Sequence, residues 1–187
     1  RSGVEGPVIG RFQAGFEKGV ADAGKKLGKD IQITSTYAGT FADASKGRAL
    51  ASSMYQAGAD IIYHAAATTG QGIFQEAKAL NETGSKDKVW VIGVDRDQNE
   101  DGKYTTKDGK DDNLTLASTI KGVNIAVKKI SDLALEDKFP GGEHLTYGLK
   151  DGGVDLTTEA LSDQAKTAVK EAKEQIISGD VKVPDQP

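Results

Sequence analysis

Helix-like and strand-like segments alternate along this chain from residue 7 to about residue 136, and this alternation is the strongest constraint on its fold. After Pro7, apolar residues recur every fourth position, as they do on one face of a helix, at Val8, Phe12, Phe16 and Val20. Strands that alternate with helices are typical of a parallel sheet with helical crossovers. The sequence therefore predicts an α/β fold with a doubly wound parallel sheet.

The expected strands are short apolar or β-branched runs bounded by polar or small residues. They fall at residues 31–37, 60–64, 89–94, 114–118 and 144–149. Residues 99–112 are polar, charged and rich in glycine, so we expect a surface loop there. Asp43 precedes a helical pattern and is expected to cap it by accepting a bond from an unpaired N–H group.

Composition excludes several classes of protein. The 187 residues are enough for a real core, and the net charge of −4 gives no basic surface for nucleic acid. The chain has no cysteine, which excludes disulfides, thiol catalysis and cysteine-based metal sites. No apolar run approaches the roughly 20 residues of a membrane helix. Residues 1–7 are expected to be a loop whose preceding strand has been cut away, so we expect the chain to be a fragment.

Four of the expected strands are followed by residues suited to hold a small polar molecule. They are Phe41, the loop from Ala67 to Gly70, Asp95 and Lys121. In open α/β sheets, ligands bind outside the carboxyl ends of the strands. The sequence therefore predicts that an aromatic ring, a small-residue loop, a carboxylate and an amine converge on one edge of the sheet.

Each of these residues also has a simpler interpretation. Asp95 suits the vicinal hydroxyls of a sugar, but it also suits a helix cap or a loop ion pair. Phe41 suits stacking on a planar ring, but also packing of its own loop. The amides from Ala67 to Gly70 are a generic polar site at a helix start. Lys121 suits ligand hydroxyls, but also a solvated position at a helix start.

No motif for a cofactor or a catalytic centre is complete. Gly70 and Gly72 form a Gly-x-Gly, but Gln75 stands where the dinucleotide fingerprint needs a third glycine. His64 and His144 lack metal-ligand spacing, and no set of nucleophile, base and orienting residue is visible. We therefore expect no cofactor and no enzyme activity. A weaker alternative is a calcium loop, whose ligands would be Asp97, Asn99, Asp101 and Asp108, with aspartate in place of the usual final glutamate.

Four segments together resemble one family. They are residues 6–16, 58–66, 89–98 and 148–154, which read GPVIGRFQAGF, GADIIYHAA, VWVIGVDRDQ and GLKDGGV. The sequence is similar to the basic membrane protein (Bmp/PnrA-like) lipoproteins, the substrate-binding components of bacterial nucleoside ABC transporters. The resemblance covers essentially the whole chain.

The resemblance implies a type I periplasmic-binding-protein fold with two lobes, of which this chain holds mostly the second. Residues 1–136 would form that lobe without its first strand, and residues 137–187 would form a hinge-crossing and C-terminal segment. Phe41 would stack on the base, and Asp95 and Lys121 would contact ribose. Ala67 stands where the family usually has glycine, so a methyl group narrows the expected base pocket.

The same resemblance implies partners and a location. The ligand would be a nucleoside, with purines favoured, and the partners would be an ABC permease and the missing N-terminal lobe. The full-length protein would be extracytoplasmic and lipid-anchored. Two alternatives from other classes are an α/β enzyme that acts on a nucleoside or sugar, with Asp95 as base, and the ligand-sensing core of a transcription regulator.

Overall fold

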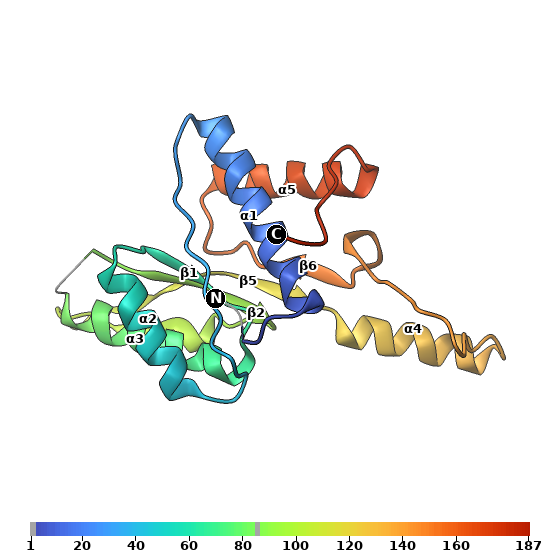
Figure 1. The fold of residues 1–187 in the computed structure, drawn as a ribbon, viewed down its shortest axis with the longest axis horizontal. Coiled ribbons are helices and arrows are strands. Elements are labelled where there is room, and N and C mark those ends of the chain that lie inside the picture. The colour runs from blue at the N-terminus through green and yellow to red at the C-terminus, as the bar shows by residue number, and fades with distance from the viewer. Residues whose placement is uncertain (1–2, 85–86) are drawn as a thin grey trace.

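The computed structural model describes residues 3–84 and 87–187 (Figure 1). Its helices are α1 (Pro7–Leu27), α2 (Ala44–Gln56), α3 (Ala67–Thr83), α4 (Val123–Leu135) and α5 (Asp163–Ser178), with short 3₁₀ turns η1 (Glu100–Gly102) and η2 (Leu149–Asp151). Its strands are β1 (Ile61–Tyr63), β2 (Trp90–Asp95), β3 (Lys103–Thr105), β4 (Asp111–Asn113), β5 (Thr115–Lys121) and β6 (Val154–Leu156).

The main sheet has four strands in the order β1-β2-β5-β6. β1, β2 and β5 are parallel, and β6 pairs antiparallel with β5 at the edge. α2 and α3 lie on one side of this sheet, and α1 and α5 lie on the other (Figure 1). The predicted α/β class with a mostly parallel sheet is confirmed.

The helix ends follow the expected local chemistry. Pro7 is the first residue of α1, and Gly28 ends that helix in the left-handed conformation at φ 63°. The Asp43 carboxylate accepts a hydrogen bond of 2.9 Å from the backbone N–H of Lys46, so the predicted cap of α2 is confirmed.

The core lies between the sheet and the pair α2 and α3. Its most buried side chains include Ile62, Ile73, Val91 and Leu114. The two helices approach so closely that a Cβ on Gly72 would lie 1.8 Å from the Ala44 carbonyl oxygen. A Cβ on Gly47 would lie 1.9 Å from the Thr69 carbonyl oxygen. Only glycine at these two positions allows the observed contact between the helix backbones.

The prediction of a strand at residues 31–37 is wrong. A strand needs a hydrogen-bonded neighbour, and in residues 3–84 and 87–187 no strand pairs along this segment, whose Ile31 and Ile33 are 46% and 39% exposed. The Gly3 N–H donates to Ala65 at 3.0 Å, and the Gly39 N–H donates to Gly3 at 2.7 Å. Gly3 thus joins the end of this segment to the turn after β1.

Two further expectations need correction. Residues 144–149 do not form a strand; the strand is β6, which begins at Val154 because that residue pairs with Lys121 of β5. The expected loop at residues 99–112 contains η1 and enters the β3–β4 hairpin. The hairpin is stabilised by Tyr104, which is buried and donates a hydrogen bond of 2.7 Å to Asp112. Residues 103–113 are polar or glycine except for Tyr104, so they carry no apolar pattern that predicts the hairpin.

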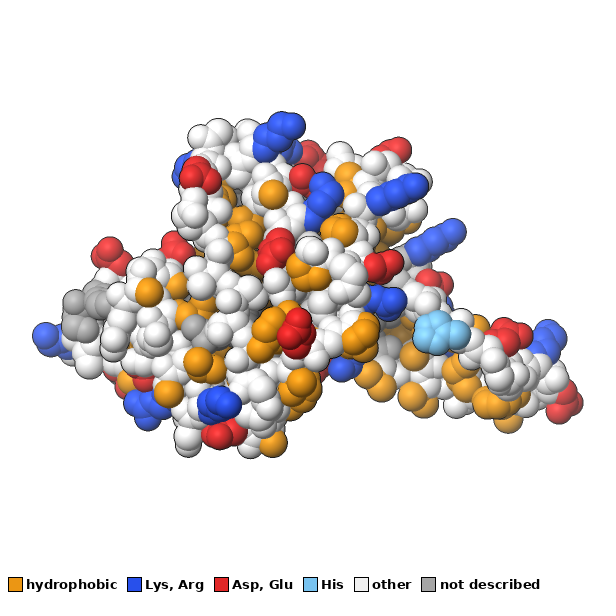
Figure 2. Space-filling model, viewed as in Figure 1, with side chains coloured by type: hydrophobic (Ala, Val, Ile, Leu, Met, Phe, Trp, Pro, Cys, Tyr) orange, Lys and Arg blue, Asp and Glu red, His pale blue; other side chains and the backbone are white. Residues whose placement is uncertain are grey.

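α4 has the expected apolar stripe, yet none of its residues is buried. Val127 is 59% exposed and Leu135 is 85% exposed. The helix projects from the rest of the molecule, and hydrophobic side chains gather along its lower edge (Figures 1 and 2). Within the described residues, no helix is long and apolar enough to span a membrane.

Candidate ligand-binding site

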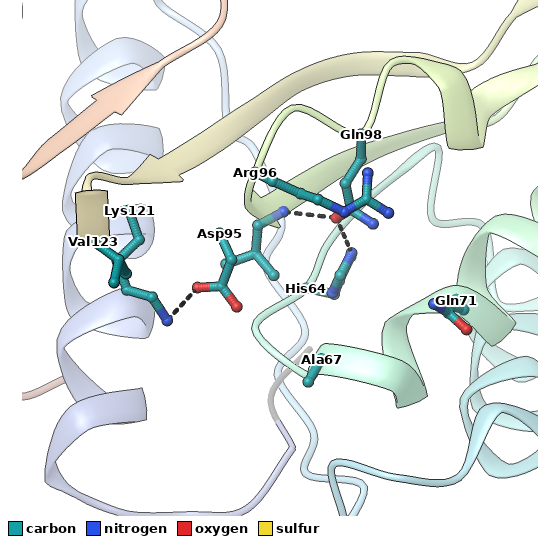
Figure 3. A pocket seen from close by; sticks show the side chains of 9 residues that line it. His64, Ala67, Gln71, Asp95, Arg96, Gln98, Lys121 and Val123 are labelled. Atoms are coloured by element: carbon teal, nitrogen blue, oxygen red, sulfur yellow. Dashed lines mark hydrogen bonds and ion pairs between the residues drawn. The ribbon is translucent and has the colours of Figure 1, made fainter. Parts of the chain in front are cut away.

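A pocket of about 250 Å³ opens at the carboxyl edge of the parallel strands (Figure 3). It is lined by residues that follow β1, end β2 and β5, or begin α3 and α4: His64, Ala67, Gln71, Val94, Asp95, Arg96, Gln98, Lys121 and Val123. Its position agrees with the rule that ligands of open α/β sheets bind beyond the strand carboxyl ends.

Asp95 and Lys121 form the charged part of the pocket. They are the last residues of two adjacent strands, β2 and β5, and the Asp95 carboxylate lies 2.7 Å from the Lys121 ammonium. Both side chains are about half exposed, at 42% and 53%. A carboxylate and an ammonium held together in this way offer both acceptors and donors to the hydroxyl groups of a polar ligand.

Ala67 begins α3 on another wall of the pocket. Its backbone has φ 45°, and the preceding residue Ala66 gives the helix no side-chain cap. The role of the first α3 amides as a polar site stays a prediction. One of them is already used, since the Thr69 N–H donates to the Phe41 carbonyl oxygen at 3.2 Å.

Phe41 lies beside this site but does not line the pocket. Its ring is 40% exposed and lies over Gly3, where an added Cβ would come within 2.1 Å of the ring. Its loop is attached to α3 because the Thr69 hydroxyl donates to the Thr40 carbonyl oxygen at 3.1 Å. Of the residues predicted at the strand ends, Ala67, Asp95 and Lys121 line one pocket. Phe41 lies in a loop beside it.

Gly70 is buried in the first turn of α3. A Cβ at this position would lie 2.2 Å from Nδ1 and Cε1 of His64. The glycine therefore makes room for the histidine ring.

His64 and Gln98 are two pocket residues that the sequence did not assign to the site. His64 is buried, and burial lowers its pKa to about 4. Its Nε2 lies 3.0 Å from Gln98 Oε1, and the Val94 N–H donates to the same oxygen at 2.8 Å. Their signal in the sequence was their position, since each is a polar residue shortly after a strand.

The four residues of the calcium alternative do not come together. Asp108 lies in the β3–β4 turn, where it accepts a hydrogen bond from Thr106 and pairs with Lys110. Asp101 pairs with Arg96 at 2.7 Å. In the described part of the chain, no group of three or more acidic or histidine side chains is placed to hold a metal ion.

The fold and the pocket together define a class of protein, an α/β domain with a polar pocket at the carboxyl edge of a mostly parallel sheet. The family model described as "ABC transporter substrate-binding protein PnrA-like" matches residues 2–187. The chain belongs to this family.

Curated relatives agree with this assignment. The chain is 48% identical over 185 residues to the ABC transporter nucleoside-binding protein BmpA of Lactococcus lactis, with 98% of the chain covered. It is 48% identical to the CD4+ T-cell-stimulating antigen of Listeria monocytogenes, and 34% identical to basic membrane protein A of Borreliella burgdorferi. The chain spans about half the length of these relatives, at 52%, 51% and 49%.

Solved structures show the same fold. A solute-binding protein of an ABC transporter system from Aeropyrum pernix superposes with a TM-score of 0.81 at 26% identity, covering 98% of this chain and 56% of that one. A transcriptional activator of the comK gene from Bacillus halodurans superposes with a TM-score of 0.68 at 19% identity, covering 96% of this chain and 65% of that one. The second likeness is one of fold alone. None of these relatives or neighbours is named as an enzyme.

Proposed function

We propose that the protein captures nucleosides for an ABC transporter and that this chain supplies one half of the binding site. The observation that carries the proposal is the Asp95–Lys121 pair, held at 2.7 Å on adjacent strand ends and exposed to the pocket. Ribose presents neighbouring hydroxyls, which the carboxylate accepts from and the ammonium donates to. The name of the 48% identical relative, a nucleoside-binding protein, supports the same ligand class.

The base would lie toward Phe41. The exposed ring and its attachment to α3 through Thr69 support a stacking role on the near side of the pocket. Purine nucleosides are favoured over pyrimidine nucleosides because their larger ring system covers more of an aromatic face. The Ala67 methyl group limits how closely the base approaches the start of α3.

The second half of the site would come from the part of the relatives that this chain does not cover. Residues 1–136 form the second lobe and residues 137–187 the hinge-crossing and C-terminal segment, and nucleoside binding closes the two lobes. The lobe also takes one more parallel strand between β1 and residues 31–37. The hydrogen bonds of Gly3 to Ala65 and Gly39, and the 40% exposure of Ile61, support that strand.

The same role implies a membrane partner and a location for the full-length protein. The partner would be an ABC permease, and the full-length protein would act outside the cytoplasm, held at the membrane by a lipid anchor. The proposed mechanism is reversible capture without chemistry.

The experiment is calorimetry on the full-length protein with inosine, adenosine, cytidine and free ribose. Asp95→Ala is expected to weaken purine nucleoside binding about thirtyfold, as for a lost hydrogen bond to a charged group. Asp97→Ala, which removes a neighbouring exposed carboxylate outside the pocket lining, is the matched control and is expected to bind as the parent does. An unchanged dissociation constant for Asp95→Ala contradicts the assigned role.

A further inference from the structure

His64 lies between the two walls of the pocket and contacts both. On one side its ring packs against Gly70, in the first turn of α3, so closely that a Cβ there would lie 2.2 Å from Nδ1. On the other side its Nε2 lies 3.0 Å from Gln98 Oε1, in the loop that follows β2. Figure 3 shows His64 between Gln98 and the start of α3.

The hydrogen bonds fix which nitrogen of His64 carries the proton. The backbone N–H of Val94 only donates, so the Gln98 atom that it meets at 2.8 Å is the acceptor oxygen. His64 Nε2 approaches the same oxygen and therefore carries its hydrogen. Nδ1 is left as a buried acceptor that has no hydrogen-bond partner among residues 3–84 and 87–187. The lowered pKa of this histidine, about 4, agrees with a neutral ring at pH 7.

Gln98 extends this contact to the rest of the sheet edge. Its N–H donates to the Ser118 hydroxyl of β5 at 3.0 Å, and its side-chain amide donates to Asp101 at 2.8 Å. Asp95 lies between Val94 and Gln98 on the same short turn. The position of the Asp95 carboxylate therefore depends on where Gln98 is held.

On each wall, the residue that His64 contacts lies the same number of positions after a residue with positive φ. Gly70 follows Ala67 by three residues, and Gln98 follows Asp95 by three residues. Ala67 and Asp95 both have positive φ, at 45° and 70°. Strained backbone of this kind persists only where the surrounding structure holds it. His64 contacts the surroundings of both strained residues.

We propose that His64 is a positioning residue that sets the spacing between the Ala67 wall and the Asp95 wall, and through it the affinity for the ligand. This deepens the proposed nucleoside site and rests on it. His64 does not touch the ligand in this proposal. Its ring fills the space against Gly70, and its Nε2–H holds Gln98 and the turn that carries Asp95.

The test uses the full-length protein with two substitutions that separate the two contacts. His64→Phe keeps a ring against Gly70 but has no donor for Gln98. His64→Gln offers an amide donor near the place of Nε2 and is the conservative rescue. His64→Phe is expected to weaken inosine binding about tenfold, and His64→Gln is expected to recover most of that loss.

Tyr55→Phe is the matched control for a purely structural effect. Tyr55 is as buried as His64 and donates one hydrogen bond, of 3.1 Å, to the Trp90 carbonyl oxygen away from the pocket. It is expected to lower the melting temperature without changing affinity. In an Asp95→Ala background, His64→Phe is expected to change affinity little, because its effect acts through Asp95. An undiminished tenfold effect there overturns the proposal.

A second readout needs no ligand. Amide hydrogen exchange of the unliganded protein is expected to speed up in residues 93–98, which lose the donor to Gln98, in His64→Phe and not in Tyr55→Phe. Residues 65–71 keep a ring against Gly70 in this variant and are expected to exchange as in the parent. Unchanged exchange in residues 93–98 overturns the proposed positioning role. If the parent protein binds no nucleoside, the proposed function fails, while the exchange result still decides the role of His64.

Discussion

Asp95 and Ala67 adopt left-handed backbone conformations on two walls of the same pocket, with φ of 70° and 45°. Within the described residues, one further non-glycine residue, Asp137, has a positive φ. Such conformations cost free energy in residues that carry a Cβ, and they cluster at binding sites. Two of these residues line the same pocket. The backbone there holds a geometry that costs free energy, as is common at binding sites.

Replacing Ala67 by glycine is expected to stabilise the protein by about 1 kcal/mol, because glycine adopts the left-handed conformation without steric cost. The matched control is Ala66→Gly, since Ala66 has φ −139° and gains nothing from the change. That variant is expected to be destabilised. Urea unfolding of both variants measures the difference, and equal effects would show that the backbone of Ala67 is not strained.

The glycines between α2 and α3 are expected to tolerate no side chain. Gly47→Ala and Gly72→Ala each place a methyl group within 2 Å of a backbone carbonyl oxygen, as the values of 1.9 and 1.8 Å show. Overpacking of this kind costs about 1–3 kcal/mol, and more where backbone must move. At Gly19 in α1, an added Cβ would meet no described atom within 4 Å beyond its chain neighbours and its own helix backbone, so Gly19→Ala is expected to gain about 0.5–1 kcal/mol instead. Thermal unfolding of the three variants checks the order, and a loss in Gly19→Ala equal to the others would refute it.

His64 is expected to make stability fall with acid between pH 6.5 and pH 4. Burial lowers its pKa from 6.5 to about 4, so in this window the unfolded chain binds a proton that the folded chain does not. Stability is therefore full above pH 6.5, and about 3 kcal/mol is lost by pH 4. His64→Gln removes this contribution. Urea unfolding of both proteins across the window checks it, and parallel pH curves would disprove it.

The chain of residues 1–187 alone is expected to bind nucleosides weakly or not at all. It spans about half of the relatives it matches, and its pocket is walled by one sheet edge and the starts of two helices. Ligands in clefts owe their affinity to burial on most sides. Calorimetry of this chain with inosine, beside the full-length protein, is the measurement. Micromolar binding by the short chain would contradict the expectation.

Much of the fold was predictable because helix and strand signals here are local. The predicted start of α1 at Pro7 and the predicted cap at Asp43 depend on chemistry within one helical turn, and both are confirmed. Residues 31–37 have the composition of a strand, but the structure gives them an isolated bridge residue, Tyr37, and no strand. A strand depends on a partner elsewhere in the chain, which composition does not reveal.

The candidate site was predictable where one topological rule sufficed. Asp95 and Lys121 end adjacent parallel strands, so the rule places them together, and the structure does so at 2.7 Å. The rule does not predict which buried side chains pack against these strand ends. His64 and Gln98 meet through side-chain contacts of buried groups, and such contacts have no signature in spacing along the chain. The calcium pattern is close in sequence, but Asp108 lies at the turn of the β3–β4 hairpin, while the other three residues precede β3.

The hydrogen bonds of Gly3 hold it beside the turn that follows β1. Gly3 donates to Ala65, which lies next to His64 in sequence and two residues before Ala67. Gly3 also lies only four residues before Pro7, so the segment that leads into α1 is held beside the residues that carry His64 and Ala67. A change in the backbone at Gly3 would therefore reach the turn after β1 and the start of α1 together.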